Sequence, residues 1–271
     1  MKPLSVSLLG CGNMGLILLR SLVSLPFIPP KKISVFDPDP AVRKKTGNLK
    51  VLFSESAAES VKDKAMIILA VKPQNVPALL SEIQGAVPPD SLVITIAAGI
   101  SIRKVQSKLG QKHKVVRAMP NTPALIKKGM TVLAYSERVS TEEKAMVRRI
   151  FNRVGKTAVV DEERMNAVTA LSGSGPAYVF AFTEALVAGG MSMGLSEPLA
   201  YRMVTQTIFG SIKMLIKMDL SPKEQIEKVT SPGGTTLAGL SMLEKKGFKD
   251  AVISAIEAAT HRAEELGQKD S

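Results

Sequence analysis

Apolar and polar positions divide the chain into two parts with different patterns. In residues 4–9 apolar and polar side chains alternate, as in a β-strand, whereas residues 65–71 are apolar throughout, as in a strand buried on both faces. Similar runs predict further strands at 32–36, 51–53, 92–96, 114–118, 131–135 and 157–160. Helical patterns lie between them at 14–24, 41–46, 76–84, 101–110 and 140–155. This alternation predicts an α/β fold, a Rossmann-like doubly wound parallel sheet with right-handed crossovers.

Beyond position 161 the strand pattern ends, and helices are predicted at 162–170, 177–190, 198–218, 222–229, 236–246 and 249–266. Two helix starts carry strong local signals. Ser140 and Glu143 form a capping box, and Ser221 precedes Pro222 at the first helical position, with Glu224 as the acidic partner. We therefore expect two domains: an α/β domain over residues 1–160 and an all-helical domain over residues 161–271.

The helix predicted at 198–218 is apolar on more than one face. Its apolar positions are Leu199, Ala200, Met203, Val204, Ile208, Phe209, Ile212, Leu215 and Ile216. A helix that is apolar on most sides needs cover on most sides, and a domain of about 110 residues cannot easily wrap it. This pattern predicts a homodimer built through the helical domain. The alternative is a central helix enclosed within one subunit.

Composition narrows the class of protein. The chain has one cysteine and two histidines, His113 and His261, so it can form no intramolecular disulfide and offers no basis for a zinc site. We expect no bound metal and a reducing, cytoplasmic location. The longest apolar stretch, residues 177–195, is interrupted by Glu184, so we expect no membrane span.

The formal net charge of +12 raises the question of an acidic partner. The basic residues are scattered in pairs and triplets, no run reaches five, and no aromatic residues interleave with them. We therefore expect no nucleic-acid binding, and a basic surface with no polymeric partner. A basic nucleic-acid binder remains an alternative, which a gel shift that vanishes at modest salt would reduce to non-specific attraction.

The motif GCGNMG, which comprises Gly10, Cys11, Gly12, Asn13, Met14 and Gly15, has two interpretations. Cys11 could end a lipoprotein export signal, or the glycines could form the turn that holds a dinucleotide pyrophosphate. Only Lys2 is charged before the motif, and the alternation in residues 4–9 indicates a strand rather than a signal helix. A strand before the motif and a helix after it favour the dinucleotide turn.

Asp37 follows the second predicted strand, roughly 20 residues after the glycine turn. At that place an acidic side chain accepts hydrogen bonds from the adenosine ribose and repels an added 2′-phosphate. We therefore expect NADH or NADPH as cofactor, with NADH favoured, although the basic residues at 43–45 weaken the preference. The alternative for Asp37 is a turn residue within Asp-Pro-Asp-Pro.

Further candidate loops lie at the ends of buried strands and before helices. Ala70, Val71, Lys72 and Pro73 follow one strand, and Ala97, Ala98 and Gly99 follow another, where small residues would admit a flat nicotinamide. In the helical domain, Ser172–Pro176 and Ser231–Thr236 both precede helices, and Ser174 could offer its hydroxyl to a ligand. The free amides at 231–236 would suit a carboxylate. Asn121 lies in a loop made rigid by two prolines, where its side chain can bond the loop backbone in a purely architectural role.

These segments together resemble pyrroline-5-carboxylate reductase. The resemblance is carried by AVKP (70–73), IAAG (96–99), RAMPNTP (117–123), SGSGPAY (172–178) and SPGGTT (231–236), in that order. It implies an NAD(P)H-dependent enzyme that reduces 1-pyrroline-5-carboxylate to L-proline, the last step of proline biosynthesis. It also implies a helical homodimer, often assembled into a homodecamer, with active sites between subunits.

The resemblance assigns roles by position. Cofactor would lie on 10–15, 70–73 and 97–99, and substrate on Ser174, Asp219, Gly233, Gly234, Thr235 and Thr236. Thr236 would lie near the ring nitrogen as the catalytic residue, as a proton donor or only an orienting group, whereas the motif around Asp219 is loose. Asp37 departs from the serine or Asn-Arg often found after the second strand in this family.

Reduction of a cyclic imine needs alignment of two rings more than a strong acid or base, which agrees with the lack of a histidine motif. Two other functions remain open. A β-hydroxyacid-type dehydrogenase would need a positioned base such as lysine, and none stands in a convincing motif. A non-catalytic dinucleotide-binding regulatory protein would bind NADH without turning over any cyclic imine.

Overall fold

The computed structural model describes residues 3–268 of the chain, apart from the side chain of Gln268. The described chain divides into two compact units. The first unit contains the residues up to Ser174 and those from Ala258 onward, and the second is Gly175–Glu257. The expected boundary lay between residues 160 and 161, whereas the first unit continues past it. Beyond the expected boundary, Met165 belongs to an apolar core of the first unit, and Ala263 is buried.

An eight-stranded sheet forms the centre of the first unit, in the order β3-β2-β1-β4-β5-β6-β7-β8. The strands are β1 (Val6–Leu9), β2 (Ile33–Phe36), β3 (Leu52–Phe53), β4 (Met66–Leu69), β5 (Leu92–Thr95), β6 (Lys114–Met119), β7 (Gly129–Tyr135) and β8 (Gly155–Val159). Strands β1 to β6 are parallel to one another. All eight strands were expected, and the sheet confirms the Rossmann-like architecture.

One part of the expected sheet was wrong. Strand β7 runs antiparallel to β6, and β8 runs parallel to β7, so the last two strands are reversed. The connection between β6 and β7 contains only a short 3₁₀ turn, Thr122–Ile126. A parallel return needs a crossover of about a dozen residues or more, usually a helix, and this segment is too short to provide one.

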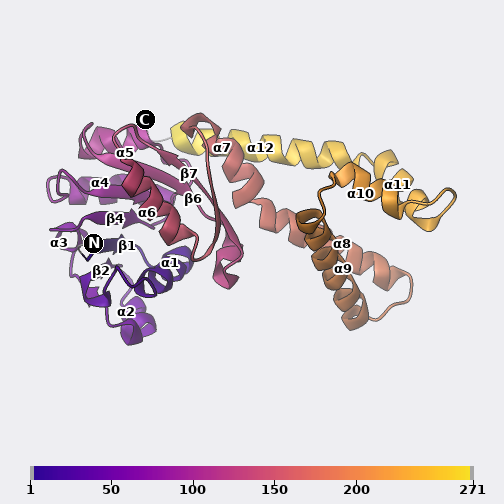
Figure 1. Cartoon of the computed structure of the whole chain (residues 1–271), viewed down its shortest axis with the longest axis horizontal. Coiled ribbons are helices and arrows are strands. Elements are labelled where there is room, and N and C mark those ends of the chain that lie inside the picture. The colour runs from indigo at the N-terminus through magenta and orange to yellow at the C-terminus, as the bar shows by residue number, and fades with distance from the viewer. Residues whose placement is uncertain (1–2, 269–271) are drawn as a thin grey trace. The chain divides into compact units, whose positions relative to one another are not determined.

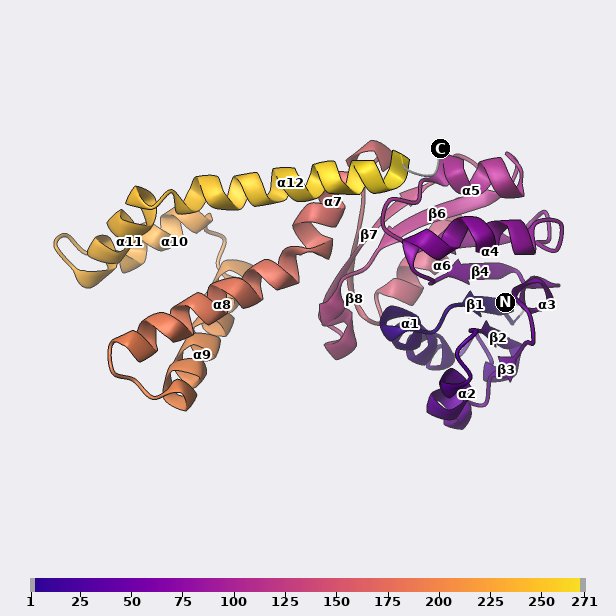
Figure 2. The same cartoon turned by 180° about the vertical axis from the view of Figure 1, so that it is seen from behind.

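Helices cover both faces of the sheet and create two apolar cores. Helices α1 (Asn13–Val23) and α6 (Thr141–Phe151) pack on one face, and α3 (Ala57–Val61), α4 (Val76–Ile83) and α5 (Ile102–Leu109) pack on the other. Figures 1 and 2 show these two layers from opposite sides. Successive strand residues alternate between the cores: Leu8 faces the first and Leu9 the second. Short helix α2 (Ala41–Thr46) follows β2.

The segment that leaves the sheet is less regular than expected. A continuous helix was predicted at 162–170, but the chain forms a 3₁₀ turn Glu162–Arg164, the short helix α7 (Met165–Val168) and a π-helical turn Thr169–Gly173. The amide of Ser174 donates to the carbonyl of Thr169, which is the five-residue spacing of a π-turn. A Cβ on Gly173 would lie 2.5 Å from the Met119 methyl group, so β6 approaches this turn closely.

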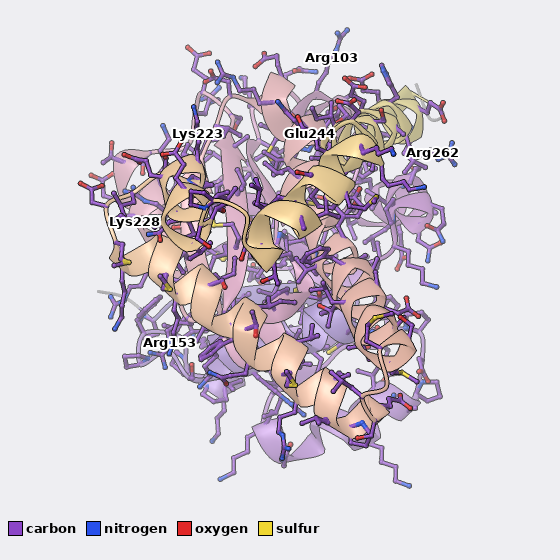
Figure 3. The ribbon with its side chains drawn as sticks, turned by 90° about the vertical axis from the view of Figure 1, so that its right-hand side faces the viewer. Arg103, Arg153, Lys223, Lys228, Glu244 and Arg262 are labelled. Atoms are coloured by element: carbon purple, nitrogen blue, oxygen red, sulfur yellow. The ribbon has the colours of Figure 1, made fainter. Side chains whose placement is uncertain are left out.

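The second unit is helical and has almost no buried side chains. It contains α8 (Gly175–Ser192), α9 (Glu197–Lys217), α10 (Pro222–Val229), α11 (Thr235–Lys245) and the start of α12 (Phe248–Gln268). Helices α8 and α9 pack side by side through Gly190 and Ala200, and Ala200 is the only buried residue of the unit. Lys223 and Lys228 extend outward from α10 (Figure 3). A unit without a core cannot account for its own stability.

Both predicted capping motifs are confirmed. The Ser140 hydroxyl accepts from the Glu143 amide, and the Glu143 carboxylate accepts from the Ser140 amide, at the start of α6. Ser221 and Glu224 form the same reciprocal pair before α10, where Pro222 occupies the first turn. These starts depend on residues three positions apart, so their sequence signal was sufficient.

Candidate active site

Four neighbouring strands end at one edge of the sheet and bring the predicted cofactor loops together. Leu9 of β1 is in register with Phe36 of β2 and with Leu69 of β4, and Leu69 is in register with Thr95 of β5. The glycine turn, Asp37, the 70–73 loop and the 97–99 loop therefore start from adjacent positions along this edge. From β1 the sheet is extended on one side by β2 and β3 and on the other side by β4 and β5. Open α/β sheets bind ligands at such a change in the direction of strand addition.

Gly10 and Gly15 are required by close backbone packing. Gly10 has φ +91°, and a Cβ there would lie 2.8 Å from the carbonyl carbon and oxygen of Ala70. A Cβ on Gly15 would collide with the carbonyl oxygen of Gly10. These contacts bring α1 directly against the end of β1, as the glycine-rich turn was expected to do.

Gly12 differs, because a Cβ at this position would meet no protein atom within 4 Å. Gly12 is the N-cap of α1, and no side chain caps the helix there. The amides of the first turn, beginning at Asn13 and Met14, therefore have no side-chain acceptor at the open side of the turn. Helix α1 has eleven residues, and its uncapped N-terminus lies beside an exposed glycine. This arrangement fits a pyrophosphate group.

The Asp37 carboxylate holds the glycine turn in place. One of its oxygens accepts from the amide of Cys11 at 2.6 Å, and the other accepts from the amide of Asp39 at 2.9 Å. Asp37 therefore acts as a turn residue in the structure, as its alternative interpretation predicted. Each carboxylate oxygen has a second lone pair, so both bonds leave capacity for the two hydroxyls of a ribose.

Cys11 is a packed side chain rather than a reactive one. It is 5% exposed, and burial, followed by the charge of Asp37, raises the pKa of its thiol to about 11, with Arg20 opposing the change. The thiolate, which is the reactive form, is almost absent near neutral pH. Cys11 therefore fills space in the turn as a small, packed side chain.

The two other cofactor loops differ in exposure. Ala97 and Gly99 are buried and Ala98 is partly buried, whereas Lys72 is exposed at the N-cap of a 3₁₀ turn. Gly99 has φ +75°, and a Cβ on it would lie 3.1 Å from the amide nitrogen of Gly267 near the end of α12. The 97–99 loop is therefore compact and closely packed, and its contact with a nicotinamide ring stays a prediction.

Asn121 has an architectural role. Its side-chain oxygen accepts from the Met130 amide at 2.8 Å, and its side-chain nitrogen donates to the carbonyl oxygen of Ser172 at 3.1 Å. It thereby ties the connection between β6 and β7 to the π-turn that precedes Ser174. Ser174 is partly buried at the end of this turn.

The remaining substrate candidates lie in the second unit. Gly234 is the N-cap of α11, again without a side-chain cap, and Gly233 has φ +70°. Thr235 and Thr236 are the first two residues of this helix and are exposed. Helices α1 and α11 thus share a glycine start and open amides, which is the arrangement that attracts an anion. Asp219 is exposed in the short segment between α9 and α10.

Neither histidine belongs to these loops. His113 immediately precedes β6 and therefore lies at the opposite edge of the sheet from the glycine turn, and burial lowers its pKa. The His261 side chain is 77% exposed on α12, beside Glu264. Within residues 3–268 no cluster of three metal-binding side chains is present, and no described helix is long and apolar enough to cross a membrane.

Sequence reasoning missed one buried polar cluster beside the 97–99 loop. Arg117 of β6 is 6% exposed and lies 3.6 Å from the carboxylate of Glu162. The available signal was a single charged residue inside the otherwise apolar core of a buried strand. A buried charge requires a partner, and no local pattern identifies Glu162 as that partner.

Family models match two parts of the chain. Residues 162–266 match the model described as pyrroline-5-carboxylate reductase dimerisation. Residues 5–99 match the model described as NADP oxidoreductase coenzyme F420-dependent. The second match covers β1 to β5 and the loops at their carboxyl ends, and the first covers the helical region.

Whole-length relatives agree with these matches. The pyrroline-5-carboxylate reductase of Synechocystis is 38% identical over 269 residues, covering 98% of this chain and 99% of the relative. That of Escherichia coli is 38% identical over 267 residues, covering 97% and 98%. A crystal structure of the Plasmodium falciparum pyrroline carboxylate reductase with NADP bound has a TM-score of 0.89 and 32% identity, covering 99% of this chain and 100% of that one.

Proposed function

The chain belongs to the pyrroline-5-carboxylate reductase family, and we propose that it reduces 1-pyrroline-5-carboxylate to L-proline with NADH or NADPH. The observation that carries this function is the match of reductases of this name at 38% identity over nearly the whole chain. The match extends over both units, so it includes the cofactor loops and the glycine start of α11. It favours this reaction over a β-hydroxyacid dehydrogenase or a non-catalytic dinucleotide-binding protein.

The first unit holds the cofactor in this proposal. The open amides of α1 and the space at Gly12 receive the pyrophosphate, Asp37 receives the adenosine ribose, and the 97–99 loop receives the nicotinamide. When bound, the reduced nicotinamide supplies the hydride that the imine carbon accepts. The chain's own task is to hold the cofactor and substrate rings together, since correct alignment removes most of the entropic barrier.

The second unit holds the substrate. The amides at the start of α11 bind the substrate carboxylate, and the Thr236 hydroxyl bonds the ring nitrogen, either as proton donor or as an orienting group. A helix N-terminus contributes about 0.3–1 kcal/mol to such a contact, and each amide adds a directional hydrogen bond. Ser174 and Asp219 stay predicted substrate contacts.

The same proposal includes the choice between NADH and NADPH and the oligomeric state. NADH is preferred over NADPH, because the carboxylate of Asp37 would face an added 2′-phosphate. The helical unit forms a homodimer through its exposed apolar residues, in agreement with the match to a dimerisation family. A homodecamer and a cytoplasmic location stay predictions.

The direct test is oxidation of NADH and of NADPH, measured separately, with 1-pyrroline-5-carboxylate and the purified chain. We expect turnover that depends on the imine and yields proline. Saturable NADH binding without turnover would instead identify a non-catalytic protein.

Thr236 is tested with Thr236→Ala and Thr236→Ser. The alanine variant should lower kcat/KM about tenfold or more, because the ring nitrogen of the bound substrate loses its hydrogen-bond partner, while serine should keep most activity. Ser241→Ala, at an exposed position on the same helix, is the control. Unchanged kcat and KM in Thr236→Ala would remove Thr236 from the mechanism.

A further inference from the structure

The loop between β5 and α5 is held at each end by specific contacts. The amide of Ile96 donates to the Leu69 carbonyl and continues the ladder beyond β5. The Ala97 amide donates to the hydroxyl of Thr95, the last residue of that strand, at 3.3 Å. Gly99 lies against the end of α12. The position of this loop therefore depends also on the backbone that follows it, where α5 begins.

Glu162 binds the backbone at the start of α5. One oxygen of its carboxylate accepts from the amide of Ile102, the first residue of α5, at 2.6 Å. Ser101, the N-cap, satisfies the Lys104 amide. Two of the amides that a helix start leaves unpaired are thus satisfied, one of them by a residue sixty positions away in the sequence. A negative charge is also favourable at a helix N-terminus.

The same carboxylate oxygen lies beside a buried cation. It is 3.6 Å from Nη1 of Arg117, and Nη2 of Arg117 donates to the side-chain oxygen of Asn166 at 3.1 Å. Arg117 is in register with Thr95 on the neighbouring strand, so the ion pair lies next to the start of the loop. Burial lowers the pKa of Arg117, and Glu162 opposes this change. Without Glu162 this guanidinium would lose its ion-pair partner, which is unfavourable for a buried charge.

We propose that Glu162 is a positioning residue for the nicotinamide half of the cofactor: by joining the first amide of α5 to Arg117, it sets the conformation of the Ala97–Gly99 loop. The inference rests on the proposed function only for the assignment of this loop to the nicotinamide. The glycine turn and Asp37 lie on other strands, so the adenosine and pyrophosphate part of the site does not depend on Glu162.

The test uses two probes, ADP-ribose, which lacks the nicotinamide, and NADH, whose nicotinamide fluorescence reports its surroundings. In Glu162→Ala, the Kd of ADP-ribose should stay within about twofold of wild type, because other loops hold that part. The fluorescence of bound NADH should change, and kcat with 1-pyrroline-5-carboxylate should fall about tenfold, since hydride transfer depends steeply on alignment. A larger primary isotope effect with NADH deuterated at C4 should accompany the fall.

Two further variants separate positioning from folding. Glu162→Gln keeps an oxygen for the Ile102 amide but not the charge, so its fluorescence and kcat should lie between those of wild type and Glu162→Ala. Glu163→Ala, at the adjacent exposed position, should match wild type. If Glu162→Ala does not fold, Glu162→Gln is judged by the same readouts.

The proposal is overturned if NADH fluorescence and kcat match wild type in the Glu162 variants. It is also overturned if ADP-ribose binding weakens by the same factor as kcat, which would indicate a general loss of structure. Failure of the proposed function would look different: wild type would not turn over the imine, while the two binding measurements would still decide the role of Glu162.

Discussion

At the scale of single residues, three glycines of one turn have different tasks. Gly10 needs a left-handed backbone and leaves no room for a Cβ beside Ala70. Gly15 allows α1 to approach the carbonyl of Gly10. Gly12 has φ −63° and open space around it, so no feature of the protein itself excludes a side chain there. The open space at Gly12 is therefore free for the proposed phosphate group.

This difference predicts opposite outcomes for two alanine variants. Gly12→Ala should leave the thermal unfolding midpoint nearly unchanged, within about 0.5 kcal/mol of stability, yet weaken NADH binding about tenfold by filling the proposed phosphate space. Gly10→Ala should instead lower stability by about 1–3 kcal/mol, because it combines strain with a collision. Thermal unfolding and cofactor titration distinguish the two. Normal NADH affinity in Gly12→Ala would argue against a phosphate at this turn.

Asp37 allows a test of the proposed cofactor preference at the same scale. Asp37→Ser should raise kcat/KM for NADPH relative to NADH about tenfold, because a carboxylate about 4 Å from a phosphate costs roughly 4 kcal/mol at an effective dielectric of 20, before solvent and counter-charges reduce it. Serine retains an oxygen for the neighbouring amides. Asp90→Ser, an exposed site before β5, is the control. An unaltered ratio would leave Asp37 with its turn role alone.

At the scale of secondary structure, local signals were reliable where the forces are local. The capping box of α6 and the proline start of α10 appear as predicted, and most strands begin or end within two residues of the expected positions. The pattern missed α3, a helix of five residues that is too short to show a period. It also missed the π-turn at Thr169–Gly173, which Asn121 binds from another part of the chain.

The capping box provides a quantitative test. Ser140→Ala should cost about 1 kcal/mol, since the amide of Glu143 loses its acceptor. For a chain of this size the unfolding midpoint should fall by about 2–4 °C. Thr141→Ala, at the next exposed position, should shift it much less. Equal shifts in both variants would mean that the reciprocal pair contributes nothing to stability.

At the scale of the whole molecule, the second unit leaves its apolar residues uncovered. On α9 alone, large side chains that are 43–70% exposed include Tyr201, Met203, Phe209, Ile212, Met214 and Ile216. Apolar surface of this extent is rare on a monomer and indicates association. The sequence pattern of this helix predicted that need for cover, and the matched dimerisation family agrees with it.

A charge placed on this surface should prevent association. Phe209→Asp should yield monomers by sedimentation or light scattering and a lower unfolding temperature, since an aspartate cannot be buried against apolar partners. Leu125→Asp changes a side chain that is 69% exposed outside the matched dimerisation region and should keep the wild-type assembly. If the assembly of the Phe209→Asp protein had the same mass in solution as wild type, this face of α9 would be excluded from the interface.

The sequence by itself determined the features that depend on near neighbours: the α/β alternation, the glycine turn after β1, the helix caps and the excess of apolar residues on α9. Only the tertiary structure decided how distant residues meet. The reversal of β7, the bond from Asn121 to Ser172, and the pairing of Glu162 with Ile102 and Arg117 each join positions that no short-range pattern connects. Periodicity and capping act within a turn or two of chain, whereas these contacts arise from packing and from the need of buried charges and amides for partners.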